Sequence, residues 1–163
     1  MASCRYGVGG HGFTLVEILI VVVILGILAA IVIPQFADAT DSARQSTFVA
    51  DVRNYATQAY LFMEETGELV EDSATGQCPV GFDVYIDCDK WEDGTPIGGE
   101  WDFERDGFAA EGMAAGFGVD FGSDNPGDEF MAELDAILDD GNLEAGGFRK
   151  IADDRYYFIL LPS

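Results

Sequence analysis

The sequence is poor in histidine and in basic side chains. It contains one histidine, His11, and eight Lys and Arg residues against 30 Asp and Glu residues, giving a formal net charge of −22. Proteins that bind nucleic acid through its phosphates need the opposite charge, so nucleic acid is not an expected partner. After residue 12 the usual general base at neutral pH is missing, and no glycine loop with its lysine could hold a phosphate. We therefore expect no enzymatic activity.

Charge is almost absent from the first fifth of the chain. Residues 1–33 contain only Arg5 and Glu17 as charged side chains, so the net charge of −22 belongs to residues 34–163. The apolar run at 13–33, FTLVEILIVVVILGILAAIVI, would form a helix about 32 Å long, which matches the hydrocarbon core of a bilayer. It predicts a transmembrane helix. A cleaved secretory signal fits less well, because no small-residue cleavage motif or turn interrupts the run.

One acid interrupts this apolar run. An unpaired Glu17 would cost roughly 2.5 to 3.5 kcal/mol in a membrane helix, so a positive partner is expected. The preceding segment, residues 1–12, is short and rich in glycine, as in a leader peptide. Cleavage between Gly12 and Phe13 would create an ammonium group one helical turn from the Glu17 carboxylate. The leader and the acid then have a common explanation.

The segment from Gly12 to Glu17, GFTLVE, followed by the apolar run and Pro34, resembles the type IV prepilin class. This class includes type IV pilins and the pseudopilins of type II secretion, and the resemblance covers residues 12 to about 60. It implies that a prepilin peptidase cleaves after Gly12 and methylates the amine of Phe13. It also implies that Glu17 pairs with the N-terminal amine of a neighbouring subunit during assembly.

The resemblance further implies partners and a location. The subunit would be a homo-oligomer in a helical filament, built by the pilus assembly machinery of the inner membrane. Its precursor would lie in the inner membrane, and the assembled product would be an extracellular pilus. A pseudopilin, with a periplasmic filament that serves protein secretion, is the nearest alternative. A monomeric membrane-anchored binding module that keeps its leader is a third hypothesis.

The fold class expected from these features is α+β and pilin-like, with a long N-terminal helix packed on a small antiparallel sheet. Residues 1–12 form the cleaved leader, 13–33 the membrane and filament-core helix, and 34–65 its amphipathic continuation. Residues 66–163 form an acidic globular head. Pro34 either bends a helix that continues or ends the membrane helix, and the helical pattern that follows favours the bend.

Within the head, alternation predicts strands at Phe82–Ile86 and in the stretch from Phe108 to Phe121. A helical stripe near 126–140 follows Asn125 and Pro126, which have the residue types of an N-cap and a first helical position. At the end of the chain, 148–152 and 155–161 flank two aspartates and predict a C-terminal hairpin.

Cysteine is scarce. The chain has three, and removal of the leader deletes Cys4 and leaves Cys78 and Cys88. In a domain exported across the membrane, such a pair predicts one disulfide, because the compartment is oxidising. Two free thiols in a reducing setting are the alternative.

The acidic residues of the head include candidate calcium ligands. The acids at 87, 89 and 93 resemble an EF-hand loop only superficially. Counted from Asp87, the sixth and twelfth places of the loop hold Glu92 and Gly98, where an EF-hand needs glycine and glutamate. Solvated surface acids are the simpler interpretation, so no cofactor is expected and Ca²⁺ is a weak alternative. The candidates are Asp87, Asp89, Asp93, Asp120 and Asp124.

Overall fold

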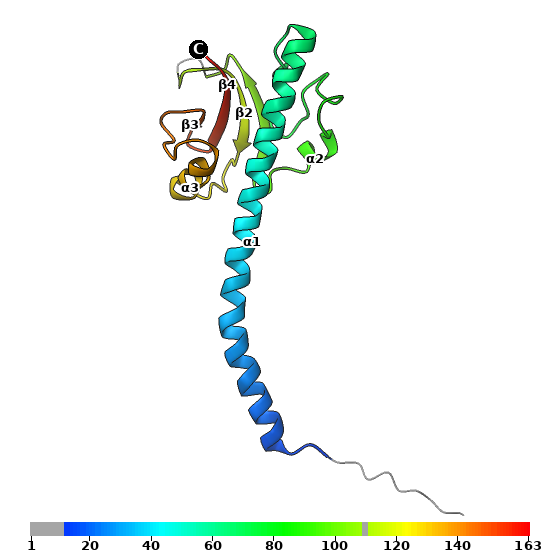
Figure 1. Cartoon of the computed structure of the whole chain (residues 1–163), viewed down its shortest axis with the longest axis vertical. Coiled ribbons are helices and arrows are strands. Elements are labelled where there is room, and N and C mark those ends of the chain that lie inside the picture. The colour runs from blue at the N-terminus through cyan, green and yellow to red at the C-terminus, as the bar shows by residue number, and fades with distance from the viewer. Residues whose placement is uncertain (1–11, 109–110) are drawn as a thin grey trace, which may run out of the picture. The chain divides into compact units, whose positions relative to one another are not determined.

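The computed structural model describes residues 12–108 and 111–163, so the predicted leader lies outside the described residues except for Gly12. The chain divides into two compact units, Met1–Thr40 and Asp41–Ser163. One helix of 52 residues, α1 (Leu15–Thr66), contributes to both units. Figure 1 shows it in blue, cyan and green.

In the first unit, α1 is apolar on all sides and continues through position 34. A proline removes one backbone donor, but the helical hydrogen bonds on either side can hold the helix together. The alternative in which Pro34 ends the membrane helix is therefore wrong, and the bend stays a prediction.

In the second unit, one face of α1 packs into the core. Phe48 stacks on Trp101 with ring centroids 5.2 Å apart, and Tyr55 meets the same indole edge-on at 5.0 Å. The helix ends before Gly67, as its sequence predicts: this glycine has a φ of 73° and its N–H donates to the carbonyl of Met63. The buried residues of this face recur every three or four positions and confirm the amphipathic pattern: Phe48, Val49, Val52, Tyr55, Ala56, Ala59 and Phe62.

The sheet is antiparallel throughout, with four strands in the order β1-β2-β4-β3. The strands are β1 (Glu100–Arg105), β2 (Met113–Asp120), β3 (Phe148–Ala152) and β4 (Arg155–Pro162), with β1 and β3 at the two edges. Strands β3 and β4 form the predicted hairpin. Figure 1 shows the C-terminal part of α1 beside this sheet. The α+β arrangement expected from the sequence is confirmed.

The predicted strand at Phe82–Ile86 is wrong, because this segment forms turns. The N–H groups of Tyr85 and Ile86 both donate to the carbonyl of Phe82, which closes a turn in place of a strand ladder. Phe82 and Ile86 are buried and Val84 is exposed, so the apparent alternation reflects two core contacts made from a turn. The stretch predicted from Phe108 begins as a strand only at Met113.

The predicted helix near 126–140 is present as α3 (Asp128–Leu138), but it starts two residues later than expected. Its N-cap is Gly127, not Asn125. The Asn125 side chain instead accepts a hydrogen bond from the N–H of Gly127 and so stabilises the turn that precedes the helix. Strand β1 and the five-residue helix α2 (Cys88–Glu92) were not predicted from the sequence.

Candidate functional site at the start of α1

The first turn of α1 is organised by Thr14 and Glu17. The backbone N–H and the hydroxyl of Thr14 both donate to Oε2 of Glu17, at 2.8 and 2.7 Å. In return, the N–H of Glu17 donates to the Thr14 hydroxyl at 3.2 Å. This reciprocal pair is a capping box, which satisfies donors that a helix start leaves without partners. Its signal, Thr-x-x-Glu, was in the sequence and was missed.

The helix that follows carries its apolar side chains outward. Leu15–Ile33 has a mean hydropathy of 3.3, none of this span is buried within the chain, and it is long and apolar enough to cross a membrane. Phe13, two positions before this span, is 82 % exposed. A contiguous apolar surface of this extent requires lipid or other apolar helices around it. Glu17 is the one charged side chain within it.

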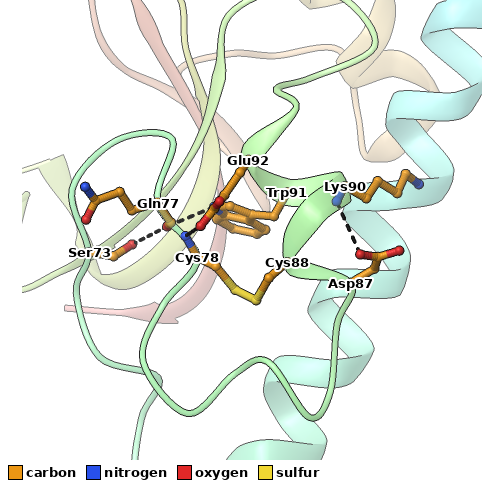
Figure 2. The surroundings of a disulfide bond; sticks show 8 residues. All are labelled: Ser73, Gln77, Cys78, Asp87, Cys88, Lys90, Trp91 and Glu92. Carbon is orange, nitrogen blue, oxygen red and sulfur yellow. Dashed lines mark hydrogen bonds between the residues drawn. A yellow bond between two sulfur atoms is a disulfide. The ribbon is translucent and has the colours of Figure 1, made fainter.

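The two remaining cysteines are joined, as expected, by a disulfide between Cys78 and Cys88. Figure 2 shows its surroundings: the indole N–H of Trp91 donates to the carbonyl of Gln77 at 3.0 Å, which links the two sides of the closed loop. A disulfide that closes a loop of this size typically stabilises a fold by roughly 2 to 3 kcal/mol. The bond therefore holds α2, and with it the buried Trp91, against the core.

Helix α2 is also tied to α1 by charge. Lys90 of α2 donates a hydrogen bond to the carboxylate of Asp51, which is only 6 % exposed on α1. At the start of α2, the side chain of Asp87 accepts a hydrogen bond from the N–H of Lys90 (Figure 2). These contacts give Asp87 a structural role as a helix cap.

A partly buried charge network lies on the sheet. The Arg155 guanidinium contacts carboxylates of Asp102, Glu104 and Asp120 at 3.4, 3.0 and 2.9 Å. Burial raises the pKa of Asp102, while a hydrogen bond from the Tyr157 hydroxyl and the charge of Arg155 act in the opposite direction. The network ties β1, β2 and β4 together and offers no free nucleophile.

The five candidate calcium ligands are only partly brought together. Asp93, Asp120 and Asp124 line one open pocket, whereas Asp87 and Asp89 lie on and beside α2 outside it. Asp120 already pairs with Arg155. Within 12–108 and 111–163, one group of three or more potential metal ligands has its atoms within 4.8 Å of one another, and it contains none of these five.

Comparison with known proteins agrees with the geometry of the N-terminal segment. Residues 10–33 match the profile of the prokaryotic N-terminal methylation motif. A fimbrial protein of Pseudomonas aeruginosa is 41% identical over 73 residues, which cover 44% of this chain and 47% of that protein. The type II secretion system core protein G of the same species is 45% identical over 51 residues, 31% of this chain and 36% of that protein.

A third relative is the type IV narrow pilus major component PilA5 of Thermus thermophilus, 60% identical over 35 residues, which cover 22% of this chain and 30% of that protein. The matches thus span less than half the length of these relatives. No solved structure matches the chain significantly.

A capped apolar helix with one acid thus coincides with the match to the methylation motif. The N-terminal segment is similar to those of several type IV pilins and of a type II secretion system core protein.

Proposed function

We propose that this chain is the precursor of a structural subunit of a type IV pilus. A prepilin peptidase removes residues 1–12 by cleaving after Gly12 and methylates the new amine of Phe13. The trimmed subunits leave the inner membrane through the pilus assembly machinery and stack their α1 helices into an extracellular filament. In this filament, Glu17 of one subunit pairs with the Phe13 amine of a neighbour, and Pro34 marks a bend in the helix.

The observation that carries this proposal is the start of α1. Its 19-residue span from Leu15 has no side chain buried within the chain, and its single acid lies four positions after Phe13. A carboxylate among lipid chains or apolar helices is stabilised when a cation pairs with it, because opposite charges attract strongly at low dielectric constant. Cleavage supplies one such cation per subunit, and parallel packing of identical helices would bring the two groups together.

The test is the intact mass of material sheared from cells that express the protein. We expect a chain that starts at Phe13, carries one added methyl group and has lost two hydrogens to the disulfide. A polymer that lacks the protein, or contains it with residues 1–12 attached, would overturn the proposal. The latter result would favour the membrane-anchored binding module.

The similarity to the type II secretion system core protein G supports a second candidate, a pseudopilin. Both candidates predict the same processed terminus, so the mass does not separate them. Deletion of the gene does. Loss of surface filaments with normal protein secretion supports the pilus, and retained pili with failed secretion supports the pseudopilin.

A further inference from the structure

Three acids meet where α3 ends. Asp135 lies in the last turn of the helix, and Asp139 and Asp140 follow it directly. Each offers one carboxylate oxygen, and these three oxygens lie within 4.8 Å of one another. Asp139 and Asp140 are exposed, so the group is open to solvent on their side.

Asp135 gives this group its significance, because its side chain is fully buried and neither carboxylate oxygen has a hydrogen-bond partner. Burial and the neighbouring charges of Asp139 and Asp140 raise its pKa to about 6, while the nearby N–H groups of Gly141 and Asn142 act in the opposite direction without reaching hydrogen-bond geometry. A buried carboxylate without a partner is costly and rare in folded proteins. One of its oxygens lies within 4.8 Å of an oxygen from each of the other two carboxylates, a position in which a cation could bind all three.

The protein supplies no such cation from the neighbouring side chains that the structure describes. The last turn of α3 has no basic residue, and its end carries the negative pole of the helix dipole. Arg53 donates to the backbone carbonyl of Ile137 at 2.8 Å, and Arg149 donates to that of Gly146. Lys150 pairs with Asp128. The negative charge at this point is left for an ion from solution.

We propose that Asp135, Asp139 and Asp140 bind a hard divalent cation, with Ca²⁺ as the preferred ion. All three ligands are oxygens, which excludes a site built for soft metals. Ca²⁺ accepts six to eight oxygens in irregular geometry, so water and loop carbonyls can complete its shell, whereas Mg²⁺ demands a near-ideal octahedron. The bound ion would fix the end of α3 to the loop that leads to β3.

The test is calorimetric titration of the full chain in detergent micelles with CaCl₂, after treatment with a chelator. About 1 M NaCl in the buffer shortens the Debye length to roughly 3 Å and suppresses diffuse attraction of ions to the acidic head. We expect one saturable site and, with excess Ca²⁺, a thermal midpoint raised by about 5 °C. The matched control is Asp124→Asn, an acid outside the group, which should leave both results unchanged.

Two variants locate the site. Asp135→Asn removes the buried ligand, and the exposed double variant Asp139→Asn with Asp140→Asn keeps the interior intact and so tests the site even if the first variant does not fold. Both should lose the saturable binding. Absence of saturable binding in the wild type, or binding that survives in the double variant, overturns the site. Equal affinity for MgCl₂ overturns the preference for Ca²⁺.

Discussion

At the scale of single residues, Glu17 has one observed role and one proposed role. Its carboxylate accepts two hydrogen bonds from Thr14 and so caps the helix, a role that needs an oxygen acceptor but no charge. Its proposed role in assembly needs the negative charge itself. The two roles can therefore be separated, because glutamine retains the acceptor and loses the charge.

We predict that Glu17→Gln keeps the start of α1 but reduces filament formation by about tenfold or more, because a neighbour's ammonium loses its buried partner. Thr14→Val, which breaks the side-chain hydrogen bonds of the cap and keeps the charge, should assemble nearly as the wild type does. The measurement is the ratio of sheared filament to subunit retained in the membrane. Equal assembly of Glu17→Gln and wild type would show that the acid serves only the cap.

A second residue-scale prediction concerns acid pH. Hydrogen bonds from the Tyr156 hydroxyl and the Lys150 ammonium lower the pKa of Asp128 from its usual 3.8. A lowered pKa stabilises the fold at pH values above 3.8, and this contribution is lost as the pH falls from 3.8 through the folded-state pKa. Because Asp128 is exposed, the contribution is modest, roughly 0.2 to 1 kcal/mol.

Thermal unfolding between neutral pH and about pH 3 measures this effect. Asp128→Asn should lower the midpoint at neutral pH, and the difference from the wild type should shrink in the acid range. Asp124→Asn serves as the exposed control, since Asp124 forms no contact with Lys150 or Tyr156 among the hydrogen bonds and ion pairs found. A difference that stays constant with pH would contradict the assignment.

At the scale of elements, the pairing of β2 with β4 depends on the absence of a side chain at Gly118. A Cβ placed there would lie 1.9 Å from the carbonyl oxygen of Tyr156, far inside van der Waals contact. Backbone cannot move aside without breaking the register in which Gly118 lies opposite Tyr157. The glycine is therefore required by a close approach between two central strands.

We predict that Gly118→Ala lowers the free energy of unfolding by about 3 kcal/mol or more. Gly147→Ala is the control, because a Cβ there would meet its nearest atoms at 3.6 and 3.8 Å, which is ordinary contact. Denaturant unfolding followed by tryptophan fluorescence reports on both, since Trp91 and Trp101 are fully buried. Equal stability of the two variants would show that the strands can separate at low cost.

The elements differ in how far the sequence could predict them, for physical reasons. Helix α1 and the C-terminal hairpin have strong periodicity and clear ends, and both were predicted. Strand β1 alternates Trp101 and Phe103 with acids, a signal that was present but overlooked among glycines and aspartates. Helix α2 is a single turn whose position depends on the disulfide and on Lys90. Such tertiary constraints leave no local pattern.

The candidate functional residues also differ in how far the sequence could predict them. The proposed processing site and Glu17 depend on residues close together in the chain, so the sequence contains the whole motif. The group at the end of α3 has its ligands at adjacent positions too, but its distinguishing feature is the burial of Asp135. Burial is a property of the folded molecule, so the spacing of acids along the chain pointed to other residues.

At the scale of the whole molecule, the dominant feature is the net charge of −22, which belongs to the part of the chain beyond residue 33. Charges of one sign repel one another in a compact head, and the repulsion is weaker when salt screens it. A head with this composition is therefore expected to be less stable at low ionic strength.

We predict that the thermal midpoint of the full chain rises between low salt and about 1 M NaCl, over which the Debye length falls to roughly 3 Å. A chelator in every sample keeps this effect separate from binding of Ca²⁺ at α3. The same series should show more efficient filament formation at the higher salt concentration. A midpoint that does not change across the range would contradict the role assigned to repulsion.

The strand order leaves β1 at one edge of the sheet, but this edge is not bare, because the N–H groups of Ser73 and Gly76 donate to the carbonyls of Phe103 and Trp101. Unpaired edges invite strands from other molecules, and a loop that covers the edge is one way in which proteins prevent it. Two of the acceptors that a strand from another head would need are already occupied, so this loop makes amyloid-like stacking along β1 less favourable.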